Sequence, residues 1–202
     1  MHKAVVLLSG GMDSAVTLYI AKQKYQCHVL IFDYGQQARK EIISAKNLAK
    51  QSSSDFYVIK ITLPWKGSAL LDKNIKIPEN GDYLGKGIPS TYVPARNIIF
   101  LSFGVSFAEA IGANAIFIGA HELDFSNYPD CRGEFFDSFQ KVINKGTKSG
   151  VNKSPVKIIT PILNKTKKEI VKTDIKHSFY IFFILIIFIP TFLLILILNI
   201  FF

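Results

Sequence analysis

Residues 9–14, with the sequence Ser-Gly-Gly-Met-Asp-Ser, limit what this chain can fold into more than any other stretch. They follow an apolar run at residues 4–8 and precede an amphipathic segment. A continuous apolar run of this length is typical of a strand buried on both faces of a parallel sheet. Two adjacent glycines allow positive φ and let successive N–H groups face one concavity, which the first turn of a helix extends. The pattern predicts a strand, a phosphate-binding turn and a helix.

The side chains in this loop favour a nucleoside triphosphate over a simple anion. Ser9 and Ser14 can donate hydrogen bonds to phosphate oxygens, whereas Asp13 would repel a phosphate and is better suited to hold Mg²⁺, directly or through water. No lysine stands where a Walker loop requires one, and there is no G-x-G-x-x-G motif. A plain turn between a strand and a helix would need only the two glycines. The complete pattern therefore predicts an ATP site with magnesium.

Composition divides the chain into two unequal parts. Its 202 residues suffice for one well-buried domain, and the net charge of +9 belongs entirely to residues 1–176. The lysines are scattered, which favours a solvated surface over a nucleic-acid site. Cys27 and Cys131 are too far apart in sequence to read as a redox or metal pair, and no signal peptide precedes the first strand. We expect a cytoplasmic protein without a nucleic-acid partner.

Apolar runs alternate with helical patterns along the first 176 residues. This alternation predicts an α/β fold, a doubly wound and mostly parallel five-stranded sheet with helices on both faces. Ligands of such sheets bind at the carboxyl ends of the strands. The predicted strands are 4–8, 28–32, 56–61, 115–118 and 156–160. The segment 64–92 has no regular pattern, and we interpret it as a cover over the pocket or as disorder without function.

Two further stretches are expected to border the nucleotide. The turn after the second strand contains Asp33 and Tyr34, and its backbone is placed to contact an adenine. Arg96 lies in the first turn of a helix that Pro94 introduces, so we predict that it contacts phosphate or pyrophosphate. An exposed arginine with no ligand would show the same pattern.

A polar run follows the fourth strand and is predicted to contact the substrate. Carboxylates there can accept from a guanine-like N–H edge, aromatic rings can stack on a base, and an arginine can bind a carboxylate. An ordinary polar turn is the alternative, because the same residue types form turns. The candidate residues are Asp124, Phe125, Tyr128, Asp130 and Arg132.

Residues 9–14 resemble the PP-loop of the N-type ATP pyrophosphatases. Together with residues 32–36, 93–97, 128–132, 160–162 and 167–170, they resemble the 7-cyano-7-deazaguanine synthase family, the preQ0 synthases of queuosine biosynthesis. The resemblance covers about residues 3–176 and implies an adenine nucleotide alpha hydrolase-like fold.

The resemblance also implies an activity and its participants. The enzyme would be an AMP-forming carbon–nitrogen ligase that converts 7-carboxy-7-deazaguanine and ammonia to the 7-cyano base, through an acyl adenylate and an amide. Its partners would be small molecules, and a homodimer is possible. The ATP-binding residues it implies, with Asp13 on magnesium, are Leu8, Ser9, Gly10, Gly11, Met12, Asp13, Ser14, Ala15, Val16, Thr17 and Leu18, joined by Asp33, Tyr34 and Arg96.

The carboxyl-terminal part departs from this family. The resemblance implies a structural Zn²⁺ site built from a cysteine cluster with a C-x-x-C pair, and two cysteines cannot supply four thiolate ligands. In its place, residues 177–202 contain 20 Phe, Ile or Leu residues out of 26 and no Asp, Glu, Lys or Arg. We therefore expect a synthase domain at 1–176 and an aberrant apolar tail at 177–202.

Three interpretations of the tail compete. Its length and the lysines before it would suit a membrane anchor, although it lacks the usual small residues and aromatic belt. A buried core helix is disfavoured because no face of it is polar. The abrupt change of composition favours a frameshift, in which case the chain could be unstable or inactive.

Two other functions stay open at this point. Another PP-loop enzyme, such as a tRNA thiolase or a lysidine synthetase, would need a tRNA-binding extension or a catalytic cysteine pair. An inactive nucleotide-binding remnant tethered to a membrane is the second.

Overall fold

A computed structural model describes residues 1–64, 67–72, 75, 87–121 and 128–177. Within these residues, five strands form one sheet in the order β3-β2-β1-β4-β5, and every neighbouring pair is parallel. The predicted fold class is confirmed. The elements are β1 (His2–Leu7), α1 (Met12–Lys22), β2 (Tyr25–Asp33), α2 (Arg39–Gln51), β3 (Asp55–Lys60), α3 (Arg96–Ile111), β4 (Ala115–Ile118), the 3₁₀ turn η2 (Pro129–Cys131), α4 (Gly133–Gly146), α5 (Lys148–Val151), β5 (Lys157–Ile159) and α6 (Lys167–His177).

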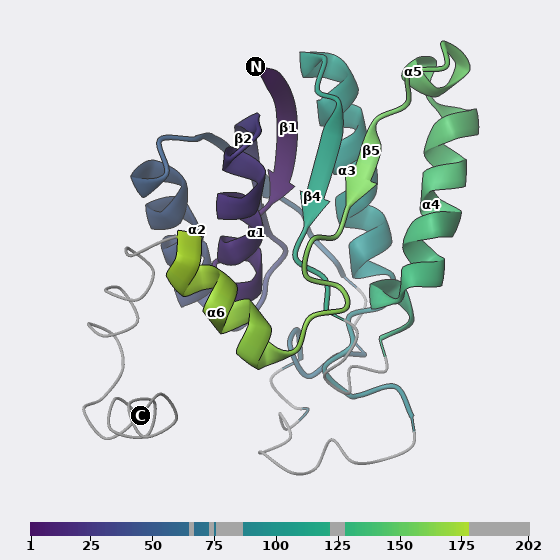
Figure 1. The fold of residues 1–202 in the computed structure, drawn as a ribbon. Helices are drawn as coiled ribbons and strands as arrows, with labels where there is room; N and C mark the ends of the chain where they lie inside the picture. Colours follow the sequence, from purple (N-terminus) through teal and green to yellow (C-terminus); the bar gives the residue numbers. More distant parts are fainter. Residues whose placement is uncertain (65–66, 73–74, 76–86, 122–127, 178–202) are drawn as a thin grey trace.

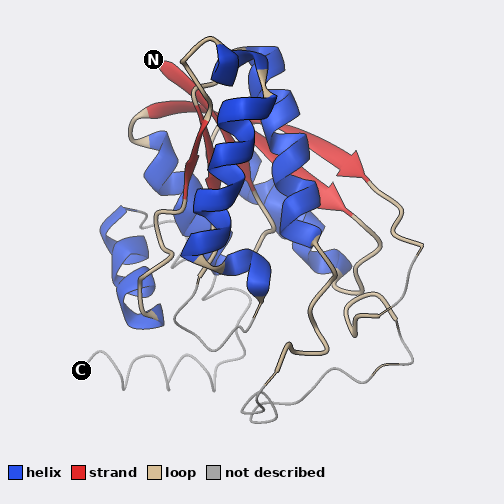
Figure 2. Cartoon of the chain, turned by 90° about the vertical axis from the view of Figure 1, so that its right-hand side faces the viewer, coloured by secondary structure: helices blue, strands red, loops and turns tan. Residues whose placement is uncertain are grey.

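Helices cover both faces of the sheet, which explains the unbroken apolar run of β1. Val5 and Leu7 point to the face covered by α3 and α4, whereas Ala4, Val6 and Leu8 point to the face covered by α1 and α2. Figure 2 shows the strands running between the helices. Successive side chains of a strand alternate between its faces, so a strand with two covered faces needs apolar residues at every position.

The arrowheads of β1, β4 and β5 in Figure 1 point in the same direction, so the carboxyl ends of these strands lie together on one side of the molecule. Helix α6 lies beside α1 toward this side, and Ile170 of α6 is fully buried against Val16 of α1 and Ile162. The last described helix is thus fixed next to the helix that follows the Ser9–Ser14 loop.

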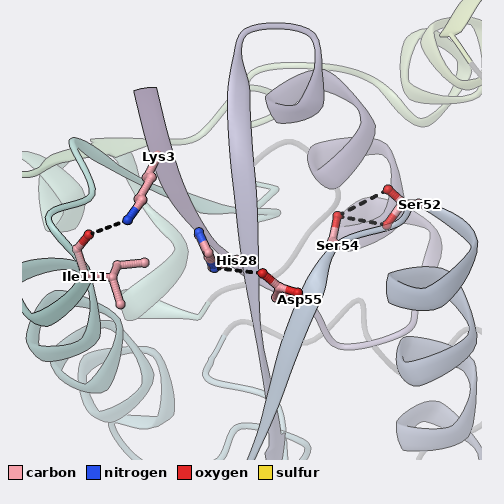
Figure 3. Close-up of polar contacts among 6 residues, drawn as sticks. All are labelled: Lys3, His28, Ser52, Ser54, Asp55 and Ile111. Carbon is pink, nitrogen blue, oxygen red and sulfur yellow. Dashed lines mark hydrogen bonds and ion pairs between the residues drawn. The ribbon is translucent and has the colours of Figure 1, made fainter. Parts of the chain in front are cut away.

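The amino ends of the strands carry polar contacts of a different kind (Figure 3). Lys3 Nζ donates to the carbonyl oxygen of Ile111, the last residue of α3, at 3.2 Å. His28 Nδ1 lies 3.6 Å from Asp55 Oδ2 across the β2–β3 pair. A cation at the carboxyl end of a helix can donate a hydrogen bond to an unpaired carbonyl, and it interacts favourably with the negative end of the helix dipole. These contacts connect strands and helix ends on the side opposite the Ser9–Ser14 loop.

The boundaries differ from the predicted ones where polar residues begin a strand. β1 and β2 start at His2 and Tyr25, earlier than predicted, because these two residues pair with each other at the amino ends of the two strands. Helix α5 and the turn η2 were not predicted, since their short sequences carry no periodic apolar pattern.

Of the predicted apolar tail, residues 178–202 lie outside the described residues. No helix in the part of the chain that the structure describes is long and apolar enough to cross a membrane. The domain boundary near residue 176 stays a prediction.

Candidate active site

The Ser9–Ser14 loop gathers its hydrogen-bond donors around one point. Ser14 Oγ accepts from the backbone N–H groups of Ser9 and Gly10, both at 3.2 Å, and from the Ser9 hydroxyl at 3.0 Å. It donates in turn to the carbonyl oxygen of Gly11 at 2.9 Å. Donors that converge in this way form a concavity suited to an anion.

Two glycines allow this loop to sit between its neighbours. Gly10 has φ +93°, and a Cβ there would lie 2.2 Å from the backbone oxygen of Glu41 in α2. Gly119, just after β4, would place a Cβ 2.8 Å from the backbone oxygen of Asp13. Both positions exclude larger residues because backbone, rather than a mobile side chain, occupies the space. The importance of Gly119 was not evident from the sequence, where it appears as an ordinary turn residue.

A pocket of about 440 Å³ opens next to this loop. It lies at the carboxyl ends of β1, β2 and β4, where ligands of parallel sheets bind. Its lining includes, among others, Leu8, Ser9, Asp13, Ser14, Phe32, Tyr34, Gln36, Glu41, Leu70, Arg96, Phe100, Gly119, His121, Tyr128, Cys131 and Lys167.

Arg96 supplies a positive charge to the pocket. Its Nη1 donates to the Tyr34 hydroxyl at 3.0 Å. Burial would lower the pKa of the guanidinium, but the neighbouring Tyr34, Asp130 and Cys131 raise the pKa above its ordinary value. Ala95 precedes it at φ 56°, a left-handed conformation that is uncommon for a residue with a Cβ. The chain therefore holds a charged guanidinium at the start of α3.

Gln36 fixes the turn that carries Tyr34. Its Oε1 accepts from the Tyr34 N–H at 2.9 Å, and its Nε2 donates to the Phe32 carbonyl at 3.1 Å. Phe32 stacks on Phe100 of α3 with the ring centroids 3.9 Å apart. Leu70, from the segment interpreted as a cover, also lines the pocket. Gln36 belongs to the stretch 32–36 that carries the family resemblance, but its hydrogen bonds within the turn were not predicted, since a glutamine in a turn has no distinctive pattern.

The residues predicted to bind ATP fall into two groups. Leu8, Ser9 and Asp13, with Ser14, Tyr34 and Arg96, line the pocket. The others do not belong to its lining: Gly10, Gly11 and Met12 form the turn and the start of α1, Ala15, Val16, Thr17 and Leu18 are buried along α1, and Asp33 ends β2.

The predicted substrate residues are more widely separated. Tyr128 lines the pocket, and its hydroxyl lies 2.5 Å from Thr91 Oγ1. Asp130 is buried, and its Oδ2 accepts from the Asn97 N–H at 3.0 Å in the first turn of α3. Arg132 is outside the pocket lining and lies 3.6 Å from Glu134. Asp124 and Phe125 lie outside the described residues.

Asn97 connects α3 to the turn that carries Asp130. Its Nδ2 donates to the Asp130 carbonyl at 2.9 Å and to Cys131 Sγ at 3.2 Å. The backbone N–H of Asn97 also donates to the Asp130 carboxylate. Asn97 and Asp130 thus connect two segments that are 33 residues apart in sequence. The Asp130 side chain thus stabilises the helix start that presents Arg96.

Glu41 and His121 are ionisable residues of the pocket that were not singled out from the sequence. Glu41 belongs to the first turn of α2; desolvation raises the pKa of its carboxyl, and the Arg96 charge opposes this shift. His121 follows β4, and its Nε2 lies 2.5 Å from the carbonyl oxygen of Lys165. Neither belongs to a recognisable motif, so only the fold brings them to the loop.

Both cysteines are buried, and burial raises the pKa of each thiol to about 11. For Cys131 the nearby Asp130 carboxylate raises the pKa further, while Arg96 and Asn97 lower it. At pH 8 each thiolate should be about 100-fold scarcer than in an exposed cysteine, so iodoacetamide should label the folded protein very slowly. Mass spectrometry after timed labelling, with urea-unfolded protein as the control, measures this. Rapid labelling of folded Cys131 would contradict it.

The side chains around Asp13 fit a magnesium ion that is shared with phosphates. Magnesium is usually held by one or two carboxylates together with phosphate oxygens and water. Asp13 lines the pocket beside Ser9 and Ser14, so one carboxylate adjoins the concavity that suits a phosphate.

Comparison with known proteins assigns the chain to a family. The family model of queuosine biosynthesis protein QueC matches residues 3–182. The chain belongs to this family. The 7-cyano-7-deazaguanine synthase of Acetivibrio thermocellus is 55% identical over 181 residues, which are 88% of this chain and 80% of that protein. The 7-cyano-7-deazaguanine synthase of Clostridium kluyveri is 52% identical, over 85% of this chain and 77% of that protein.

Solved structures of other proteins share the fold of this QueC family member. A predicted subunit of tRNA methyltransferase from Methanocaldococcus jannaschii superposes with a TM-score of 0.52 at 16% identity, over 85% of this chain and 73% of that one. NMN synthetase from Francisella tularensis superposes with a TM-score of 0.50 at 15% identity, over 87% of this chain and 61% of that one. The family and the fold expected from the motifs are confirmed, and the family is one of queuosine biosynthesis.

Proposed function

We propose that this chain converts 7-carboxy-7-deazaguanine and ammonia to 7-cyano-7-deazaguanine, using ATP and releasing AMP and pyrophosphate. The observation that carries the proposal is the convergence of loop donors on Ser14 Oγ, in a pocket that also contains the charged Arg96. The names of the relatives support the choice of substrate. The function would make the chain a carbon–nitrogen ligase.

The proposed reaction has two adenylation steps. A carboxylate oxygen of the substrate attacks the α-phosphorus of ATP, and pyrophosphate leaves. Ammonia then attacks the acyl carbon, AMP leaves with that oxygen, and loss of a proton gives an amide. The amide oxygen attacks the α-phosphorus of a second ATP, pyrophosphate leaves, and the amide nitrogen loses one proton. The resulting adenylated imidate then loses AMP and its remaining N–H proton to form the nitrile. Each carboxylate oxygen therefore leaves on one AMP.

The residues of the pocket would serve this chemistry mainly by positioning and charge neutralisation. The loop N–H groups of Ser9 and Gly10 would bind the pyrophosphate part of ATP in place of Ser14 Oγ. Arg96 would neutralise the charge that develops on the phosphate oxygens. Asp13 would hold magnesium, which when bound withdraws charge from the phosphates. Tyr128, an aromatic residue of the pocket lining, would contact the base.

The test is substrate-dependent turnover of ATP. Purified chain should form AMP and pyrophosphate only when 7-carboxy-7-deazaguanine is present, and ¹⁸O in the substrate carboxylate should appear in the AMP phosphate. A chain that forms AMP equally without this substrate, or AMP without ¹⁸O, would contradict the proposal. In that case the other PP-loop reactions, including those on tRNA, become the candidates.

Asp13 offers a second test within the same assay. Asp13→Asn should lower acyl-adenylate formation by roughly 10- to 100-fold, the range for loss of a group that orients a metal site. Excess magnesium should restore part of the rate. The matched control is Asp137→Asn in α4, which lies outside the pocket lining and should leave the rate unchanged. An Asp13→Asn chain with the normal rate would remove Asp13 from the metal site.

A further inference from the structure

Lys167, the first residue of α6, lines the same pocket as the Ser9–Ser14 loop, although more than 150 residues separate them. In the sequence, Lys167 belongs to the pattern Thr-Lys-Lys-Glu at residues 166–169, whose spacing predicts a capping box at the start of a helix. Its presence in the pocket comes from the fold. The proposed function has assigned it no role.

The position of Lys167 is fixed by the capping box of α6. Glu169 Oε2 accepts from the Thr166 N–H and from the Thr166 hydroxyl, both at 2.8 Å, and Thr166 Oγ1 accepts from the Glu169 N–H at 3.3 Å. Such reciprocal bonds stabilise the first turn of a helix. The backbone that bears Lys167 is therefore held in one conformation.

Two further contacts bring this first turn to the loop. Ile170, three residues along α6, is fully buried in the cluster that contains Val16 of α1. The preceding Lys165 carbonyl oxygen lies 2.5 Å from His121 Nε2, and His121 itself lines the pocket. Lys167 is thus carried by a helix docked on α1, the helix whose first turn includes Asp13 and Ser14.

The charges around the loop show why a lysine here matters. Residues 9–14 contain one carboxylate and no cation, whereas an ATP bound there would bring about four negative charges. Arg96 is engaged on the α3 side, where it bonds Tyr34 and lies near Asp130. Lys167 belongs instead to the α6 side, on a helix that packs on α1, and it lines the same pocket as Ser9 and Ser14.

We propose that Lys167 binds the β- and γ-phosphates of ATP and neutralises the pyrophosphate as it leaves. This inference rests on the proposed function, since it assigns a residue to the same nucleotide site. When the bond between the α-phosphorus and its bridging oxygen breaks, the electron pair stays on that oxygen, and the pyrophosphate gains negative charge. A cation that contacts this group more strongly in the transition state increases kcat as well as affinity.

The neighbouring Lys168 provides a matched control. It is exposed, belongs to the same turn of α6 and lies outside the pocket lining. Lys167→Met should lower kcat/KM for ATP by roughly 10- to 100-fold, which is the range for loss of a charge-assisted hydrogen bond. Lys168→Met should leave it within about twofold. Lys167→Arg should retain much of the activity, because it keeps the charge.

A binding measurement separates this proposal from the proposed function. Calorimetry with a non-hydrolysable ATP analogue and magnesium needs no deazaguanine substrate. Lys167→Met should weaken binding of this analogue by about 10-fold and leave adenosine binding unchanged, whereas Lys168→Met should change neither. Equal affinities of the two variants for the analogue would overturn the role of Lys167, even if the wild-type chain makes the nitrile. Weaker binding by Lys167→Met alone would support it, even if the chain proves to use another substrate.

Discussion

Replacing Gly10 with alanine is expected to destabilise the folded chain by about 3–5 kcal/mol, which corresponds to a fall in melting temperature of roughly 10 °C. Two effects add. At φ +93° a residue with a Cβ is strained. The added Cβ would also lie 2.2 Å from the Glu41 oxygen and 2.9 Å from the Ala45 nitrogen, both backbone atoms of α2. Relief of this clash requires moving α2 away from the loop.

Gly11→Ala is the control, because it makes the same chemical change one residue later. Gly11 has φ −82°, and its Cβ would approach Ser9 Oγ no closer than 3.6 Å. We expect its melting temperature to stay within a few degrees of that of the wild type. Thermal unfolding followed by circular dichroism measures both variants. An equal fall in melting temperature in the two variants would show that the contact between the Ser9–Ser14 loop and α2 does not determine the stability of this region.

Arg96→Met is expected to lower the rate of substrate-dependent AMP formation by about 10³-fold, the largest effect on activity that we anticipate. The substitution removes a charged guanidinium from the pocket and leaves the Tyr34 hydroxyl and the Asp130 carboxylate without their cation. Arg96→Lys should restore only part of the rate, since a lysine lacks the planar fork that binds Tyr34 and a phosphate together.

Arg39→Met is the matched control for this change. Arg39 is exposed at the start of α2 and lies outside the pocket lining. It should retain the wild-type rate. Because Arg96 also contacts buried groups, the melting temperature of each variant should be measured alongside the rate. An Arg96→Met chain that stays folded and keeps its rate within about threefold would exclude a role for the guanidinium in the reaction.

The sequence predicted those parts of the fold that depend on local pattern. The run at residues 4–8 indicated a strand with two covered faces, and the structure places apolar side chains of this run on both sides of β1. The Thr166–Glu169 spacing indicated a capping box, and the hydrogen bonds between these residues confirm it. Local patterns succeed here because strand alternation and helix capping are short-range effects.

What the sequence could not predict depends on contacts between distant segments. Asp130 was predicted to contact the substrate because it stands in a polar run, and that run gave no sign that its carboxylate also accepts from the Asn97 N–H, 33 residues away. Lys167 and Gly119 looked ordinary, and both acquire their positions only when α6 and β4 pack on α1. The roles of individual residues in substrate binding stay predictions, as does the nature of residues 177–202.

The central position of β1 makes the amino terminus of this chain unusually intolerant of truncation. Ends of protein chains are commonly dispensable, because few contacts depend on them. Here His2–Leu7 pairs with β2 on one side and with β4 on the other. Trimming these six residues would separate the sheet into the pairs β3–β2 and β4–β5. Affinity tags are therefore better joined through a flexible linker that leaves His2 free to pair with Tyr25.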